Sequence, residues 1–364
     1  MSEPSIISPE TPPYIRCPQF RSKLVLDQLL GPTVTNYQLK KITNKGSGDG
    51  ARHFYTPIDI REAKFALYNI DPAKQPLQRP PIIYTRMAKG GTGKSTVSGN
   101  VASALAMLGY KVLAIDGDPQ ASLTNMLGID TSQDEIIHIG DLMVKSETEK
   151  TPVDFAASIK HIYPDGMLDL IPADITLTQT DAWLMTRMVR DTIFERLISN
   201  NLNFFGQYDV IVIDSAPGTT LLSYNFMAAC ETVLAVVWLD RESLKAINLL
   251  MSNVEEINRS IPGKNLDIEI IANGFHPSYK HCKEALSILA ATYPGAVNEN
   301  VIPHNTGFSR QQSLLAEDSK GPLVEQDPFS AAAKSMFDLA KGLLGRYHIT
   351  LAGWDESVMP ITRK

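Results

Sequence analysis

Short apolar runs alternate with longer amphipathic stretches from residue 82 to about residue 346. The apolar runs predict buried strands at Ile82–Thr85, Val112–Asp116, Leu168–Ile171, Val210–Asp214, Val233–Leu239, Ile268–Ala272 and Val301–Ile302. The amphipathic stretches predict helices at Ser95–Leu108, Thr176–Ile198, Ser243–Ile257, Cys282–Ala291 and Phe329–Leu344. This alternation predicts an α/β fold, in which helices cover both faces of a mainly parallel sheet.

The segment before residue 82 has a different pattern. Residues 1–13 are rich in Pro, Ser and Glu, and we expect them to be disordered. Residues 14–70 predict a small helical module, and the four prolines of residues 71–81 predict a linker. The α/β domain then covers residues 82–346, and residues 347–364 form a C-terminal tail.

Charge divides the chain in the same place. The 364 residues carry a net charge of −6, but Tyr14–Met87 contains twelve Lys/Arg against five Asp/Glu, a local net of +7. This asymmetry predicts that the small module meets a polyanion. A solvated basic face is the alternative interpretation.

Targeting and metal-binding patterns are missing from the sequence. No apolar run is long enough to cross a membrane, and the first residues lack the basic and apolar stretches of a signal peptide. The three cysteines are far apart, which argues against disulfides and against zinc or iron–sulfur sites. We therefore expect a cytoplasmic protein.

A glycine-rich segment lies between the first predicted strand and the first long helix. Its residues are Lys89, Gly90, Gly91, Thr92, Gly93, Lys94, Ser95 and Thr96. Glycines let backbone N–H groups approach phosphate oxygens, and the helix N-terminus adds donors. Lys94 supplies charge to the β- and γ-phosphates, and the Ser95 hydroxyl ligates Mg²⁺. The pattern predicts a P-loop, with Ala88 in place of its usual first glycine; the alternative is an ordinary glycine-rich turn.

Carboxylates follow two later strands. Asp116 and Asp118 follow the strand that begins at Val112, and Asp214 ends the strand that begins at Val210. An apolar strand that ends in aspartate beside a P-loop is typical of support for the Mg²⁺ of a bound nucleotide. Each aspartate taken alone could also be a turn or cap residue.

Together these segments resemble the ParA/MinD superfamily of ATPases with a deviant Walker A motif. Val301-Ile302-Pro303-His304-Asn305 and the run from Ser319 to Pro328 resemble its ParA branch. The resemblance implies ATP and Mg²⁺ as cofactors, weak intrinsic ATP hydrolysis, an ATP-sandwiched homodimer, DNA binding, a ParB-like centromere-binding partner and a nucleoid-associated location.

The resemblance also implies roles for single residues. Lys89 would reach the phosphates of the partner protomer, and Lys94 would act with it in catalysis. Asp118 would position the attacking water, while Asp116 and Asp214 would hold Mg²⁺ through water beside Ser95. Asn273 would contact adenine. The family usually has Asn where this chain has Met87, so no contact from that position is expected.

The N-terminal module has the proportions of a helix–turn–helix. Leu24–Leu30 predicts one helix, Thr33–Ile42 predicts a recognition helix, and Asn44–Gly50 predicts the turn of a wing from which Arg52–Tyr55 returns. This pattern resembles the winged helix-turn-helix of longer plasmid ParA proteins. The candidate DNA contacts are Thr33, Thr35, Asn36, Lys40 and Lys41, with Lys280, Lys283, Arg310 and Lys320 in the large domain. A structural or dimerising helical extension is the alternative for the N-terminal module, and solvated surface charges are the alternative for the four residues of the large domain.

These observations favour an ATP-dependent DNA-partition ATPase acting on a plasmid or a chromosome. An ATP-gated repressor of its own operon uses the same residues and differs in its target. A MinD-like regulator needs an amphipathic C-terminal helix, but Gly353 and Pro360 interrupt the tail. An iron–sulfur reductase would need cysteine ligands, and an amide-forming synthetase would need a glutaminase segment. Neither feature is found in this sequence.

Overall fold

The computed structural model describes residues 14–30, 34–43, 54–75, 77–132, 135–149, 152–309, 311 and 321–353. Several predictions concern residues outside this part of the chain and stay predictions. They are the disordered tail 1–13, Thr33, the wing turn at 44–50, Arg310, Lys320 and the end of the tail from residue 354.

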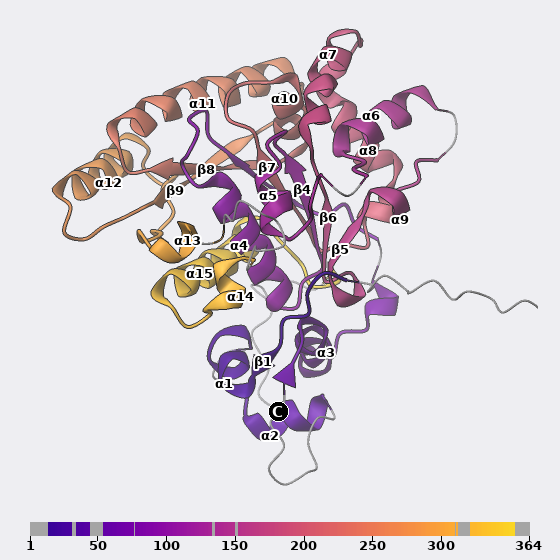
Figure 1. Cartoon of the computed structure of the whole chain (residues 1–364), viewed down its shortest axis with the longest axis vertical. Coiled ribbons are helices and arrows are strands. Elements are labelled where there is room, and N and C mark those ends of the chain that lie inside the picture. The colour runs from indigo at the N-terminus through magenta and orange to yellow at the C-terminus, as the bar shows by residue number, and fades with distance from the viewer. Residues whose placement is uncertain are drawn as a thin grey trace, which may run out of the picture.

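A seven-stranded sheet forms the centre of the molecule (Figure 1), in the order β5-β6-β4-β7-β3-β8-β9. Its strands are β3 (Ile82–Arg86), β4 (Val112–Gly117), β5 (Lys160–Tyr163), β6 (Leu168–Ile171), β7 (Val210–Ser215), β8 (Thr232–Trp238) and β9 (Asp267–Asn273). All neighbouring strands pair in parallel except β5, which is antiparallel to β6 at the edge. The predicted mainly parallel sheet is therefore confirmed. The edge strand was not predicted, because it has polar residues at Lys160 and His161 and lacks a continuous apolar run.

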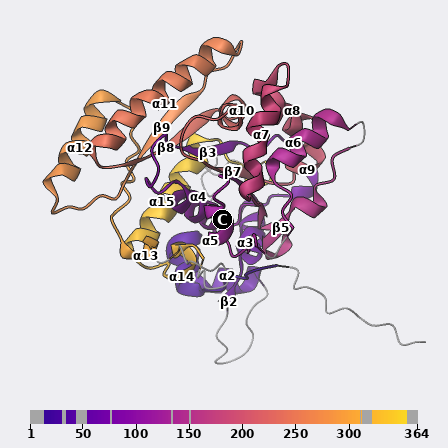
Figure 2. The same cartoon turned by 45° about the horizontal axis from the view of Figure 1, so that its top comes forward.

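Helices cover both faces of this sheet (Figure 2), with a separate apolar core on each face. One face carries α4 (Lys94–Met107), α5 (Ser122–Met126), α14 (Leu323–Gln326) and α15 (Ala331–Arg346), and the apolar side chains of α3 (Pro57–Tyr68) belong to the same core. The other carries α6 (Ile139–Thr148), α7 (Gln179–Met185), α8 (Ile193–Asn200), α9 (Leu202–Phe205), α10 (Leu221–Ala229), α11 (Arg241–Ser260) and α12 (Lys280–Thr292). Short elements are α13 (Thr306–Ser309) and the 3₁₀ turns Pro72–Lys74, Ala156–Ser158, Pro164–Gly166, Ile175–Thr178 and Arg190–Thr192. Within the described residues, no helix has both the length and the apolar character needed to cross a bilayer.

Two predicted elements in this domain were wrong. The helix expected over Thr176–Ile198 is interrupted between α7 and α8, where Val189 adopts a left-handed backbone conformation with φ of 51°. The strand expected at Val301–Ile302 is not a strand. The Ile302 amide donates to the Ala272 carbonyl of β9 at 2.9 Å, but the next pairing is only an isolated bridge between Pro303 and Phe275, past the end of β9.

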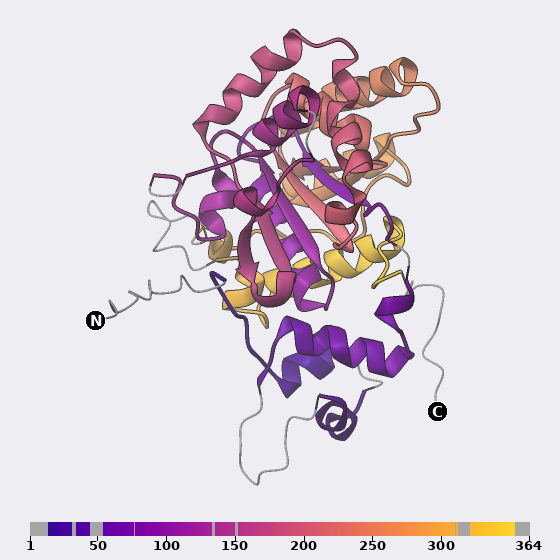
Figure 3. The ribbon, with the colours of Figure 1, turned by 90° about the vertical axis from the view of Figure 1, so that its right-hand side faces the viewer.

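The N-terminal residues form a small cap on the amino-terminal ends of the strands. Its elements are β1 (Phe20–Arg21), α1 (Ser22–Leu24), a π-helical turn (Val25–Leu29), α2 (Asn36–Ile42), β2 (Phe54–Tyr55) and α3. Figure 3 shows them in indigo and purple at one end of the molecule, next to the yellow C-terminal helix. Their apolar side chains belong to the same core as those of α4 and α15.

The recognition helix expected over Thr33–Ile42 begins later than predicted. Thr35 is its N-cap: its hydroxyl accepts the Gln38 amide while the Gln38 side chain accepts the Thr35 amide. Strand β2 pairs with β1, which precedes the first helix. The described residues show a helical module with a two-stranded sheet, and its winged-helix identity stays a prediction.

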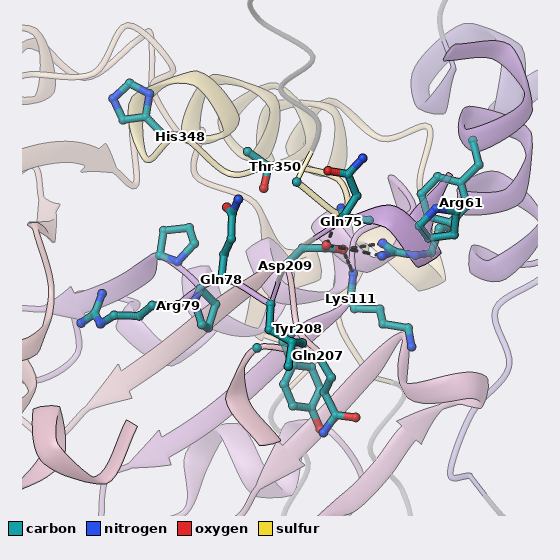
Figure 4. A pocket seen from close by; sticks show the side chains of 18 of the residues that line it. Arg61, Gln75, Gln78, Arg79, Lys111, Gln207, Tyr208, Asp209, His348 and Thr350 are labelled. Carbon is teal, nitrogen blue, oxygen red and sulfur yellow. Dashed lines mark hydrogen bonds and ion pairs between the residues drawn. The ribbon is translucent and has the colours of Figure 1, made fainter. Parts of the chain in front are cut away.

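The proline-rich segment expected as a linker packs against the large domain. Arg79 forms ion pairs with Glu195 at 2.7 Å and with Glu231 at 3.0 Å. Together with α3 and residues 348–353, this segment lines a cavity of about 540 Å³ at the amino-terminal ends of the strands. Figure 4 shows this cavity, in which Asp209 interacts with Arg61 and Lys111.

Candidate functional site

The glycine-rich segment forms the turn between β3 and α4. Gly91 and Gly93 have φ values of 73° and 90°, which residues with a Cβ rarely adopt. Gly93 is also the residue immediately before α4, and a Cβ there would collide with the Asn273 side chain. Backbone N–H groups of the turn and the first helical turn thus meet at one place, as an anion site requires.

Lys94 begins α4, and its side chain is buried. Burial lowers the pKa of Lys94, while the nearby Asp214 and Asp118 carboxylates oppose that shift. A cation held in a partly dehydrated site interacts strongly with an added anion. The position of Lys94 beside the glycine-rich turn therefore suits a phosphate group.

Three carboxylates lie at the carboxyl-terminal ends of the neighbouring strands β4 and β7. Asp116 pairs with Asp214 in the register of these strands, and both side chains are fully buried. Burial raises the pKa of both groups, and their mutual repulsion adds to the shift at Asp116. Asp118 is buried next to them, and its Oδ1 accepts the Gln120 amide at 2.9 Å. The structure thus brings together the three aspartates that sequence reasoning selected.

These carboxylates differ in how well their oxygens are satisfied. Asp116 accepts from the Asp118 amide at 3.0 Å and from the Thr124 amide and hydroxyl at 2.9 and 2.7 Å. Asp214 Oδ1 accepts from Ser98 at 3.0 Å, but Asp214 Oδ2 is buried without a hydrogen-bond partner. An unsatisfied buried carboxylate oxygen is costly unless a ligand completes it.

One more buried polar atom at the same site lacks a partner, namely the Thr92 hydroxyl in the glycine-rich turn. Among the described residues, no group of three His, Cys, Asp or Glu side chains could hold a metal by itself. A magnesium ion that receives most of its ligands from phosphates and water needs fewer protein groups. The Ser95 hydroxyl and the open oxygen of Asp214 fit such an ion.

A cavity of about 250 Å³ adjoins the glycine-rich turn. Trp238 at the end of β8 and His304 line it, with ring centroids 6.1 Å apart, and Asn273 closes it toward the turn. The Asn273 side-chain amide donates to the Thr92 carbonyl at 2.8 Å, and Gly274 lies so close to Trp238 that a Cβ there would collide with the indole. An aromatic cavity beside a phosphate site fits a flat heterocycle. Sequence reasoning selected Asn273 but missed Trp238, because an aromatic residue at a strand end is also typical of the core.

Lys89 lies apart from the buried charges of the turn. Its ammonium group forms ion pairs with Asp240 at 2.6 Å and with Glu242 at 3.4 Å. The hydrogen bond to Asp240 raises the pKa of Lys89. Its side chain is 27% exposed, so Lys89 lies at the surface of the nucleotide edge.

The candidate DNA contacts lie in two groups, one on α2 and one on α12. Asn36 and Lys41 are exposed on α2 and Lys40 is half-buried, whereas the Thr35 hydroxyl is used as the helix cap. Lys280 and Lys283 are exposed on α12, where Lys280 pairs with Glu284 at 3.4 Å.

Part of the positive charge of residues 14–87 is used inside the protein. The residues concerned are Arg16, which pairs with Glu325; Arg61, which pairs with Asp209; Arg79, which pairs with Glu195 and Glu231; and the buried Lys64 and Arg86. The local excess of +7 therefore overstates the charge that this part of the chain presents to a ligand.

Comparison with known proteins agrees with this geometry. A family model described as an AAA domain matches residues 81–270, from β3 to β9. The cell division protein PomZ of Myxococcus xanthus is 29% identical over 332 residues, which cover 91% of this chain and 95% of that protein. The chromosome partitioning protein ParA of Caulobacter vibrioides is 28% identical, with coverage of 71% and 91%.

Solved structures show the same fold. The McdA–ATP complex of Cyanothece superposes with a TM-score of 0.62 at 18% identity, covering 74% of this chain and 97% of that one. A plasmid partition protein of Borrelia burgdorferi bound to AMPPNP gives a TM-score of 0.58 at 23% identity, covering 73% and 99%. Fold, P-loop geometry and relatives agree, and the chain belongs to the ParA-type family of AAA-domain ATPases.

Proposed function

We propose that this protein is an ATP-dependent partition ATPase that moves or positions DNA. ATP with Mg²⁺ closes a homodimer, the dimer binds DNA, and hydrolysis stimulated by a ParB-like centromere-binding partner resets it. The observation that carries the proposal is a set of groups at one edge of the sheet, namely the buried Lys94 and the unsatisfied Asp214 Oδ2 and Thr92 hydroxyl. These groups are the complement of a magnesium-bound polyphosphate.

The residues divide the chemistry of ATP hydrolysis among them. Water attacks the γ-phosphorus, the bond from that phosphorus to the bridging β–γ oxygen breaks, and ADP and phosphate are released. The amides of the glycine-rich turn and Lys94 stabilise the negative charge that shifts toward the bridging oxygen. Asp118, oriented by the Gln120 amide, holds the attacking water. Ser95 and Asp214 would hold a magnesium ion here, and that ion would supply Lewis-acid polarisation of the phosphate oxygens.

The cavity beside the glycine-rich turn and the Lys89 side chain account for the adenine and for the second protomer. Trp238, His304 and Asn273 would hold adenine, and the cavity volume of about 250 Å³ accommodates a planar base. Lys89 lies at the surface of this edge, so it can reach the phosphates of a second protomer. Relatives named for cell division and chromosome partitioning support the partition role.

Two substitutions test the proposal. Asp118→Ala is expected to bind ATP, form a dimer and hydrolyse very slowly, because the variant loses the group that orients water. Lys89→Ala is expected to bind ADP normally and to lose ATP-driven dimerisation. Light scattering and phosphate release measure these properties, with Glu255→Ala on the exposed face of α11 as the control. Unchanged turnover in Asp118→Ala would move the water-positioning role to another carboxylate.

DNA binding needs a separate experiment on the full chain, because the N-terminal residues share a core with α4 and α15. Sedimentation with random duplex DNA, without nucleotide, with ADP and with ATP, measures the ATP-dependent interaction. The same assay with DNA from upstream of the protein's own gene distinguishes a partition ATPase from an ATP-gated repressor. Strong preference for that DNA over random sequence would favour the repressor.

A further inference from the structure

The resting place of Lys89 is built from two carboxylates of the β8–α11 junction. Asp240 lies immediately before α11, and Glu242 lies in the first turn of that helix. The Lys89 ammonium is 2.6 Å from Asp240 Oδ2 and 3.4 Å from Glu242 Oε2. The lysine of the glycine-rich turn is thus held by its own protomer.

The two oxygens of Asp240 have different partners. Oδ1 accepts the Ser243 amide at 2.7 Å, which caps the twenty-residue helix α11, and Oδ2 accepts the Lys89 ammonium. Burial alone would raise the pKa of Asp240, but the bonds from Lys89 and Ser243 lower it. The aspartate is therefore ionised and holds the loop of Lys89 against the start of α11.

A helix N-terminus is an unfavourable place for a cation. The aligned peptide dipoles give it a partial positive charge, which repels an ammonium group. The carboxylates of Asp240 and Glu242 are what make this position favourable for Lys89. Without their charge, the lysine would leave this position.

We propose that Asp240 and Glu242 are positioning residues that hold Lys89 within its own protomer, in competition with the phosphates of a second copy of the chain. This inference rests on the proposed dimer and adds a contact that regulates its formation. Each protomer has to break its own Lys89 contacts before its lysine can cross the interface. The two acidic residues thereby set the protein concentration at which ATP closes the dimer.

The size of the effect follows from the exposure of the contact. An exposed ion pair of this kind is worth roughly a twofold to fivefold change in an equilibrium constant. A symmetric dimer releases two lysines, so the factor is squared, to about fourfold to twenty-fivefold. Removal of the carboxylate charge is expected to tighten ATP-dependent dimerisation by that factor.

The test uses the full chain with Mg²⁺ and adenylyl-imidodiphosphate, which prevents turnover. Asp240→Asn removes the charge but keeps a good helix cap, and Glu242→Gln leaves the cap untouched. Glu255→Gln, on the same helix and 4.0 Å from Arg259, is the matched control. Sedimentation velocity over a protein dilution series is expected to show lower midpoints of dimerisation for the first two variants and an unchanged midpoint for the control. ADP affinity is expected to stay the same in all three.

A double-mutant cycle separates the proposed role from a structural one. In a Lys89→Ala background, which is expected to stay monomeric with the analogue, Asp240→Asn is expected not to restore dimerisation, because the lysine it acts through is missing. An unchanged or raised midpoint for Asp240→Asn with Lys89 present would overturn the inference. A wild-type protein that stays monomeric with the analogue would overturn the dimer itself, which is a distinguishable result.

The resting contact can also be measured without any dimer. Acetic anhydride acylates unprotonated amines, so an ion-paired lysine reacts slowly. In the nucleotide-free protein, Asp240→Asn is expected to speed the labelling of Lys89 severalfold relative to Lys334, as followed by mass spectrometry of peptides. Equal labelling rates in the wild type and the variant would show that the contact does not hold Lys89.

Discussion

Two aspartates at opposite ends of β7 have different environments. Asp209 immediately precedes the strand, and Asp214 is its fifth residue. Asp209 forms an ion pair with Arg61 and accepts the amides of Lys111 and Ala352 at 2.7 and 2.8 Å. Asp214 has one oxygen without a partner and a pKa that burial raises. The amino-terminal edge of the sheet is thus internally neutralised, whereas the carboxyl-terminal edge is incomplete without a ligand.

This difference shows how to separate a structural carboxylate from a binding one. Asp209 joins three parts of the chain, namely α3, the start of β4 and the segment after α15. The cavity beside it is about twice the size of the cavity beside the glycine-rich turn. Cavity size would have selected the wrong edge, while the unpartnered oxygen of the buried Asp214 carboxylate points to the nucleotide edge.

The largest expected effect comes from breaking the buried ion pair between Asp209 and Arg61. Asp209→Asn removes the counter-charge of the buried Arg61, and breaking a buried ion pair in this way costs about 3–5 kcal/mol of unfolding free energy. Urea unfolding of the nucleotide-free protein measures the change. Asp267→Asn, which breaks an exposed pair with Arg346, is the control and is expected to cost less than about 1 kcal/mol. Similar losses of unfolding free energy in both variants would show that the buried pair of Asp209 stabilises the fold no more than an exposed ion pair does.

At the other edge, Lys94→Ala is expected to affect binding and leave folding intact. The phosphates would lose a buried charged donor, which costs about 3 kcal/mol or roughly a hundredfold in ATP affinity. Stability without nucleotide is expected to stay the same or rise, because the variant no longer buries an ammonium group. Calorimetric titration with ATP and urea unfolding give the two values. Normal ATP affinity would contradict the P-loop assignment.

Asp214→Asn is expected to raise the unfolding free energy, whereas Asp209→Asn is expected to lower it. The folded protein holds the Asp214 proton more tightly than the unfolded chain, because burial raises this pKa above its ordinary value of 3.8. The stability due to that proton is present below the unfolded pKa and is lost as the pH rises through the folded pKa. At pH 7 the variant is therefore expected to gain about 2 kcal/mol in the absence of nucleotide.

Thermal melting between pH 5 and pH 8 checks this prediction. The wild type is expected to lose stability toward pH 8, and the variant is expected to show a flatter profile. Added ATP and Mg²⁺ are expected to stabilise the wild type but not the variant. A variant that melts below the wild type at pH 7 would show that Asp214 is structural, like Asp209.

The sequence predicted the nucleotide edge better than the opposite edge, for physical reasons. Buried parallel strands are continuous apolar runs, and Asp116, Asp118 and Asp214 are visible at their ends. The glycine-rich turn needs particular residue types in a fixed order. These features are local in the chain, and the structure brings them together as expected.

Contacts between distant segments could not be predicted in this way. Arg61 and Asp209 are 148 residues apart, and Lys89 and Asp240 are 151 residues apart. Nothing in either local sequence distinguishes a paired charge from a solvated one. The break at Val189 was missed for a related reason, because a valine in a left-handed conformation contradicts its own local preference.

The smallest expected effect concerns DNA binding. Here too, a charged side chain that is neutralised inside the protein has to be distinguished from one that is exposed without an ion pair. Lys41 is exposed on α2, and no ion pair of Lys41 is found within the described residues, whereas Arg61 in the same module is neutralised by Asp209. If α2 contacts phosphates, Lys41→Ala is expected to weaken binding to all sequences about equally and to lower the salt-dependence slope by about 1. Asn36→Ala is expected to relax sequence preference instead.

Lys280→Ala with Lys283→Ala is expected to reduce only the ATP-dependent binding, and Lys334→Ala on α15 is the control. Fluorescence anisotropy with duplex DNA at several salt concentrations measures all four. If Lys41→Ala matches the control at low salt, the module is a helical extension without a DNA-binding role, and the nucleotide site is unaffected because it depends on other residues.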